Sequence, residues 1–312
     1  MAAELSLTEL VEKLPPTDRE LEAAKATEKA AQEGATPPPP AKAPVPSKFT
    51  GPDPAQADAL CEQVLAGGRA RLMELIELVR DPADPSFNNY KPEYLLHCLS
   101  TYVARPGKET QRRLLIDALV AGLTEGNRPT AVRAMLLREL QWIGDDRAVA
   151  AVGKFLTDES LCAEAAAALL AIKPEGAARE FRRALPQATG RCRLVVVQSL
   201  AQAADPQAAS ILTEALSDSD REVRLAAAWG LARLGQASAV EALLKAADVE
   251  PSYERIKATQ ACLLLAERLA GNGNRQAATR IYRHLRDTRT DPTEQYVRQV
   301  AEKALASLQT AN

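Results

Sequence analysis

The sequence predicts an all-α fold in which helix pairs stack into a right-handed superhelix, an α-solenoid. One motif returns along the chain: Val-Arg, then Leu eight residues and Leu or Ile eleven residues after the Val, beginning at Val132, Val223 and Val297. Weaker copies begin at 161 and 192, so successive copies from 132 to 223 lie 29, 31 and 31 residues apart, as in repeats that stack on their neighbours. Aromatic residues make up only 4% of a chain that is 46% hydrophobic, and small aliphatic side chains suit closely packed helices. We therefore expect about seven helix pairs.

The chain divides into a tail, residues 1–48, and a repeat body, residues 49–312. Residues 3–33 have helical character, whereas residues 36–46 cannot be helical, because proline lacks the backbone N–H and forces its predecessor out of the α region. We expect the tail to be mobile and its proline-rich stretch to be extended, at about 3 Å per residue. This stretch is either a plain linker or a ligand for a groove that recognises proline.

From Pro54 onward, apolar residues recur at helical spacing between turn signals such as Asp81-Pro82. Acidic or hydroxyl residues that can cap free backbone N–H groups stand at several predicted helix starts, among them Asp220 and Ser252. The predicted helices are 55–66 with 69–80, then 91–104, 109–124 with 130–143, 146–156 with 159–172, 176–185 with 189–203, 207–216 with 220–234, 238–247 with 253–270, and 275–287 with 293–308.

The best copy of the motif carries a family resemblance. It contains Asp220, Val223-Arg224, Ala227-Ala228, Leu231 and Leu234-Gly235. This pattern resembles the second helix of a HEAT repeat, and the period near 31 is similar to that of the short bacterial HEAT-like repeats found in phycobilin lyases. The resemblance covers roughly residues 68–309. It implies a solenoid whose second helices line a concave surface, in a family made mostly of scaffolds and adaptors with a few enzymes.

The outward side of the second helices is the predicted binding surface. On a wheel of 100° per residue, Val223, Ala227 and Leu231 face the core, so the positions two, five, six and nine residues after the first motif residue face away from it. Apolar side chains interrupted by Trp, Arg and Gln are typical of a protein-binding surface. The predicted partner-binding residues are Trp229, Leu225, Arg138, Leu137, Gln198, Val197 and Leu194. Alternatively, neighbouring helices of a tight superhelix cover these positions.

An arginine occupies the same place in several copies of the motif. These residues are Arg133, Arg193, Arg224 and Arg298. The resemblance implies that they form a structural ladder, pairing with acidic residues of the turns between helices. A column of guanidinium groups could also bind phosphate or carboxylate ligands, because the guanidinium fork suits planar anions.

Charge and reactive residues disfavour several classes of function. Residues 1–48 carry eight acidic and six basic side chains, which leaves 33 of each in residues 49–312. This neutral body lacks the positive charge that nucleic-acid binding usually needs. The five cysteines form no CxxC pair, and His97 and His284 form no HExxH motif, so we expect no metal, no cofactor and no catalytic residue. No segment approaches the roughly 18 consecutive apolar residues of a membrane span, so we expect no membrane partner.

These observations predict a non-enzymatic scaffold or adaptor that binds a peptide or a protein domain on the concave face. Two alternatives stay open: a chromophore attachment factor resembling the phycobilin lyases, and an enzyme resembling the HEAT-like DNA glycosylases, which the neutral body disfavours. The start of the chain shows no export signal, so a cytoplasmic location is expected by default. A periplasmic or secreted location is expected instead if an export signal has been removed.

Overall fold

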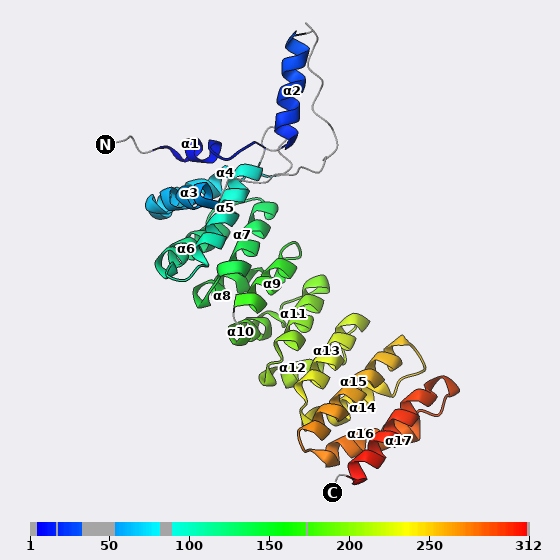
Figure 1. Ribbon diagram of the computed structural model, residues 1–312. Helices are drawn as coiled ribbons and strands as arrows, with labels where there is room; N and C mark the ends of the chain where they lie inside the picture. The colour runs from blue at the N-terminus through cyan, green and yellow to red at the C-terminus, as the bar shows by residue number, and fades with distance from the viewer. Residues whose placement is uncertain (1–4, 17, 33–53, 82–88, 173, 311–312) are drawn as a thin grey trace. The chain divides into compact units, whose positions relative to one another are not determined.

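The computed structural model describes residues 5–16, 18–32, 54–81, 89–172 and 174–310. These residues form seventeen α-helices and four short 3-10 helices, and no strand occurs among them (Figure 1). The chain separates into two compact units, residues 1–143 and residues 144–312. The all-α solenoid prediction is confirmed, because the described helices pair with their chain neighbours and the pairs stack in chain order within each unit.

Unit 1 holds two helix pairs, preceded by one more helix. The first helices of the two pairs pack on each other, and so do the second helices. The sequence grouped residues 55–66 with 69–80, and these two segments do pack on each other, while the second also packs on the helix that follows it. The helices are α3 (Pro54–Ala66), then the pair α4 (Gly68–Leu78) and α5 (Tyr90–Val103), and the pair α6 (Glu109–Thr124) and α7 (Thr130–Ile143).

Two further helices precede these, α1 (Leu7–Glu12) and α2 (Asp18–Gln32). A capping box starts α1: the Ser6 backbone N–H donates to Glu9 at 2.7 Å, and the Glu9 backbone N–H donates to the Ser6 hydroxyl at 3.3 Å. Its apolar face is buried against α3, α4 and α5. The buried side chains are Leu7, Leu10, Val11 and Leu14.

Polar contacts also fix this segment to α5. The Tyr90 hydroxyl donates a hydrogen bond to the Pro15 carbonyl at 2.8 Å, and the Lys91 ammonium pairs with Glu12 at 2.7 Å. The expectation of a mobile tail over residues 1–48 therefore needs correction for α1, because three apolar side chains on one face of the helix, together with Leu14 just after it, dock this segment on unit 1. The proline-rich residues 36–46 and the boundary at residue 48 lie outside the described residues.

Unit 2 continues the same arrangement with five helix pairs. Its second helices α9, α11, α13 and α15 lie side by side in that order (Figure 1). The seven pairs of the two units agree with the number that the repeat period predicts. The pairs are α8 (Asp146–Gly153) with α9 (Cys162–Ile172), α10 (Pro174–Ala184) with α11 (Gly190–Ala203), α12 (Ala209–Ala215) with α13 (Arg221–Leu234), α14 (Val240–Ala247) with α15 (Tyr253–Gly271), and α16 (Arg275–Thr288) with α17 (Gln295–Thr310).

Local sequence explains where α13, at the centre of unit 2, begins and ends. The Asp220 carboxylate accepts a hydrogen bond from the Glu222 backbone N–H at 2.8 Å and so caps the free N-terminal turn. Gly235 ends the helix in the left-handed conformation, with φ of 66°. Between these ends, Val223, Ala227 and Leu231 are buried, as the wheel predicts.

A glycine sets the close approach of α13 to its neighbour α11. A Cβ atom added to Gly230 would lie 2.8 Å from the Cβ of Ala201 and 3.2 Å from the Cα of the same residue. Small residues on both helices therefore bring the two backbones together. Within the described part of the chain, no helix combines the length and the apolar character that crossing a membrane requires.

Candidate functional site

The second helices α11, α13 and α15 line one groove in unit 2, which we call the α13 groove. Its volume is about 750 Å3. All of its lining side chains come from these three helices or from the residues that begin them. They are Gln198, Gln202, Glu222, Leu225, Ala226, Trp229, Tyr253, Lys257, Gln260, Ala261 and Leu264.

The arginine ladder defines which positions face the α13 groove. Arg193, Arg224 and Arg255 stand near the start of α11, α13 and α15, and the residue five positions later lines the groove in every case. Those three residues are Gln198, Trp229 and Gln260. The residue nine positions after the arginine also lines the groove in α11 and in α15, where it is Gln202 and Leu264. Equivalent positions of consecutive repeats therefore form rows across the groove.

Two aromatic rings are the largest exposed apolar groups of the groove. Trp229 is 44% exposed, and the guanidinium of Arg233 lies 4.6 Å from the centroid of its ring. Tyr253 is 53% exposed and has the side chains of Arg221 and Lys257 at 5.6 and 5.5 Å from its ring centroid. These cation–π contacts hold the rings at the surface, where each keeps apolar area open to a partner.

Amide side chains supply the polar part of the groove. Gln198, Gln202 and Gln260 are exposed, and none of them makes a hydrogen bond with another described residue. The charged residues in the lining are one Glu and one Lys, Glu222 and Lys257, so their formal charges cancel. The groove can therefore offer stacking surface and amide donors and acceptors, and the guanidinium groups of Arg221 and Arg233 add positive charge beside its rings.

The seven predicted partner-binding residues lie in different surroundings in the structure. Trp229, Leu225 and Gln198 come together in the α13 groove. Leu194 is half-buried and does not line the groove, while Arg138 is exposed on α7 of unit 1.

Two of the predicted positions need correction. Val197 and Leu137 are fully buried, although the wheel turned them away from the core. Both stand five residues after the first motif residue. In unit 2 this side of α11 meets neighbouring second helices, since α11 packs on both α9 and α13. The alternative prediction, that neighbouring helices cover the outward positions, therefore holds for the fifth residue after the first motif residue. It does not hold for the sixth, where Gln198 is exposed.

Sequence reasoning missed the contribution of α15 to the groove. Tyr253, Lys257, Gln260 and Leu264 line it, but the copy of the motif in α15 has Glu254-Arg255 in place of Val-Arg. Arg255 could have identified this copy of the motif, because it lies 31 residues after Arg224, at the same position of the repeat.

The ladder arginines of unit 2 bind carboxylates that come later in the chain. Arg193 pairs with Asp218, and Arg224 holds Glu254 through Nε and Nη2 at 2.6 and 2.7 Å. Arg255, which the sequence analysis did not include, holds Glu294 at 2.8 and 2.7 Å. The two other predicted members differ: Arg133 donates to the Gly126 carbonyl at 3.5 Å, and Arg298 makes no ion pair with any described residue.

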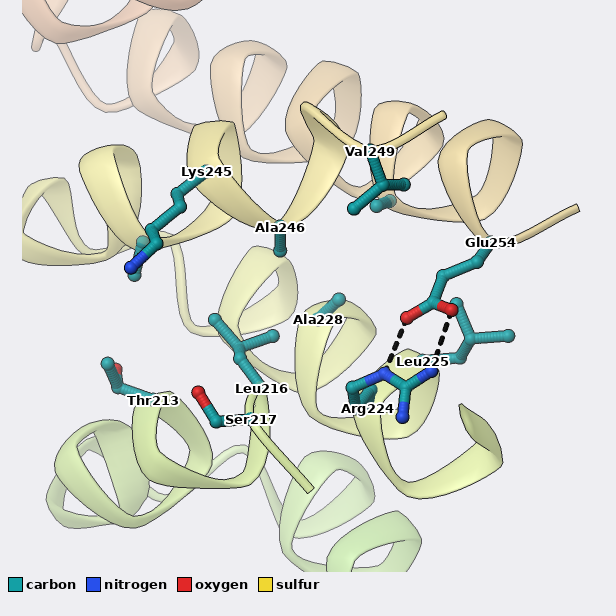
Figure 2. A pocket seen from close by; sticks show the side chains of 12 residues that line it. Thr213, Leu216, Ser217, Arg224, Leu225, Ala228, Lys245, Ala246, Val249 and Glu254 are labelled. Atoms are coloured by element: carbon teal, nitrogen blue, oxygen red, sulfur yellow. Dashed lines mark hydrogen bonds and ion pairs between the residues drawn. The ribbon is translucent and has the colours of Figure 1, made fainter. Parts of the chain in front are cut away.

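A smaller pocket lies beside the Arg224–Glu254 pair, between α12, α13, α14 and α15, with a volume of about 360 Å3 (Figure 2). The Arg224 guanidinium faces the Glu254 carboxylate there, and its Nη1 also donates to the carbonyls of Asp218 and Ser219 at 2.7 and 3.1 Å. Four of its five N–H groups are thus used within the protein. The hydrogen bond to Glu254 raises the pKa of Arg224 and lowers that of Glu254. These contacts favour a structural ladder over an anion site.

Reactive side chains are few in the described residues. Four of the five cysteines are buried, and burial raises the pKa of the Cys61 and Cys262 thiols to about 12. No group of three His, Cys, Asp or Glu side chains in the described part of the chain is arranged to hold a metal ion. His97 lies beside Glu139, with Nδ1 3.3 Å from the carboxylate, and its ring meets Trp142 edge-on at 5.6 Å.

Comparison with known proteins identifies the repeat type. No curated protein matches the chain. A solved structure of an engineered protein aligns with 77% of this chain and 96% of its own length at 20% identity, and its TM-score of 0.26 is too low to support any argument. The family model of HEAT repeats matches residues 184–263, which run from the end of α10 through α11 and α13 into α15. The three helices that line the α13 groove thus belong wholly or in part to the matched segment, and residues 184–263 of this chain are HEAT repeats.

Proposed function

We propose that this chain is a non-catalytic scaffold that binds an extended segment of a protein in the α13 groove. The observation that carries the proposal is the meeting of two exposed aromatic rings, Trp229 and Tyr253, with three glutamine amides in one groove. HEAT repeats generally serve in protein–protein interaction, and the matched repeats contain most of this groove.

The lining has the chemistry that such binding needs. Trp and Tyr supply much of the binding energy at protein interfaces, because they bury large areas and lose little conformational freedom. The amides of Gln198 and Gln260 can both donate to and accept from a peptide backbone. No feature of the described residues favours the bilin-lyase or DNA-glycosylase alternative over a scaffold.

Selection of peptides on the intact protein tests this function. A displayed library of random peptides is selected on the full chain, and the affinity of each enriched peptide is then measured for the full chain and for Trp229→Ala. We expect Trp229→Ala to weaken binding by about 30-fold, the effect of roughly 2 kcal/mol at an interface hot spot. Far-UV circular dichroism and a thermal melt check that the variant keeps its fold.

A matched control uses another exposed tryptophan of the same chain. Trp142 is 67% exposed and lies at the end of α7 in unit 1, outside the lining of the groove. Trp142→Ala should leave the affinity of the enriched peptides within about twofold of the parent value, because a residue outside the contact adds little to binding. Peptides that bind all three proteins equally would show that the α13 groove is not the binding site.

A further inference from the structure

We propose that the partner segment held in the α13 groove is acidic, with carboxylate side chains two positions away from apolar ones. The inference rests on the proposed function, because it names the class of peptide that this groove takes. Three observations carry it. Each exposed ring of the groove has a cation beside it, two of these cations have no carboxylate partner among the described residues, and ring and cation are spaced like alternate residues of an extended chain.

The two exposed rings of the groove have the same surroundings. Arg233 follows Trp229 by four residues on α13, and its guanidinium lies 4.6 Å from the centroid of that ring. Lys257 follows Tyr253 by four residues on α15, and its ammonium lies 5.5 Å from the ring centroid. Residues four apart on a helix are neighbours on one face. Each ring therefore offers apolar area next to a positive charge.

The charges of Arg233 and Lys257 are not neutralised within the described part of the chain. Neither residue forms an ion pair with another described residue. Glu222, the acidic residue of the lining, already pairs with Arg221 at 2.9 Å. The groove therefore keeps two positive charges open to a partner. Since complementary charges favour association across an interface and like charges oppose it, this groove favours a segment that carries carboxylates.

The spacing of ring and cation fits an extended chain. Alternate side chains of such a chain point to the same face, and residues two positions apart are separated by about 6.6 Å. This separation is close to the ring-to-cation distances of 4.6 and 5.5 Å. A segment that lays an apolar side chain on one ring thus brings the side chain two positions away next to the cation of that ring. Asp or Glu at this position can form a charge-assisted hydrogen bond, which is stronger than a neutral one.

The groove also has room for such a segment. On α15 the lining runs from Tyr253 to Leu264, which are eleven residues apart, or about 16 Å at 1.5 Å per residue. About five residues of extended chain cover this length. The exposed amides of Gln198, Gln202 and Gln260 can bind the backbone N–H and C=O groups of the segment. Apolar and acidic side chains can then alternate on the face that meets the rings.

Single-stranded nucleic acid is the other ligand with negative charge and groups that stack on exposed rings. Its affinity comes largely from many phosphate contacts, each of which needs a cation. The groove offers only two cations without a carboxylate partner in the described residues, and residues 49–312 carry 33 basic and 33 acidic side chains. These numbers favour a short acidic peptide over a polyanion.

Peptides selected from the displayed library on the full chain identify the class of ligand. We expect the peptides whose affinity depends on Trp229 to contain Asp and Glu about twice as often as the unselected library does, mostly two positions from an apolar residue. The tightest of these is then made as a fluorescent peptide in two forms, one acidic and one with every Asp and Glu replaced by its amide. Fluorescence anisotropy with the full chain should show the amide form binding about tenfold more weakly.

Variants of the two cations locate the charge contact. Arg233→Gln and Lys257→Gln should each weaken binding of the acidic form about threefold or more, and should leave the amide form within about twofold of its parent affinity. A displaced ring would weaken both forms, so the difference between them reports the charge. Lys245→Gln is the matched control, because Lys245 is exposed on α14 and is not part of the groove lining. It should change neither affinity.

Several results would overturn the acidic assignment. Equal binding of the acidic and amide forms, Trp229-dependent peptides without acidic enrichment, or equal losses of both forms in the cation variants would each do so, and the groove would remain a peptide site. A single-stranded DNA of about ten nucleotides that binds more tightly than the acidic peptide, and does so in a manner that depends on Trp229, would identify a nucleic-acid site instead. If no displayed peptide depends on Trp229, the proposed function fails together with this inference.

Discussion

Arg224 and Glu254 join consecutive repeats through a two-pronged ion pair, with Nε–Oε1 and Nη2–Oε2 distances of 2.6 and 2.7 Å. Arg224 lies in the first turn of α13 and Glu254 in the first turn of α15, so the pair fixes how these neighbouring second helices are aligned. The same alignment places Trp229 and Gln260 in one row of the α13 groove. The Arg224–Glu254 ion pair, which lies outside the groove, thus sets the spacing of the side chains that line the groove.

Glu254→Gln should destabilise the protein. The substitution removes the charge that two guanidinium N–H groups bind, and hydrogen bonds to charged groups contribute about 1.5–3 kcal/mol. Urea denaturation should therefore show a loss of free energy of unfolding in about that range. Glu222→Gln is the matched control, since Glu222 forms an exposed ion pair with its neighbour Arg221. The control should lose less than about 1 kcal/mol, and equal losses would show that the Arg224–Glu254 pair is no stronger than a surface pair.

The same pair should make stability depend on pH. The hydrogen bond from Arg224 lowers the pKa of Glu254 in the folded protein. A carboxylate whose pKa is depressed by folding contributes stability that is present above its unfolded pKa, about 4.3, and is lost as the pH falls through the folded value. Denaturation measured from pH 7 down to pH 3 should therefore show a steeper loss below about pH 4.3 for the parent protein than for Glu254→Gln. Parallel profiles would contradict this assignment.

Gly230→Ala should destabilise unit 2 by forcing α11 and α13 apart. The added Cβ would lie 2.8 Å from the Cβ of Ala201 and 3.0 Å from Cδ1 of Leu212, so backbone must move. Overpacking of this kind costs about 1–3 kcal/mol. Gly271→Ala, at the end of α15, is the matched control, because no atom lies within 4 Å of the added Cβ. It should stabilise the protein by roughly 0.4–1 kcal/mol, and thermal melts of both variants give the comparison.

Leu10→Ala should release α1 from unit 1. Leu10 is fully buried in the contact with α3, α4 and α5, and removing such a side chain costs about 2–5 kcal/mol. Amide hydrogen exchange over residues 7–12 should become faster, while exchange in unit 2 stays unchanged. Thr8→Ala, on the exposed face of α1, should leave exchange close to that of the parent protein. Fast exchange of these residues already in the parent protein would contradict stable docking.

The sequence by itself determined the secondary structure and the repeat. Its period placed a helix at residues 220–234, and α13 runs from Arg221 to Leu234. Apolar spacing, the cap at Asp220 and the stop at Gly235 are local features, and they act within one or two helical turns. For the same reason the sequence predicted that Leu231 is buried and that Trp229 is exposed.

Only the tertiary structure decided which outward positions stay open. A helical wheel describes one helix, but α11 has second helices on both of its sides, and Val197 is buried while Gln198, the next residue, is exposed. The partners of the ladder arginines lie 25 to 39 residues further along the chain, too far for a local pattern to assign. The docking of α1 likewise depends on three helices that follow a long stretch of chain. In each case, the packing of whole helices brings together residues that are far apart in the sequence.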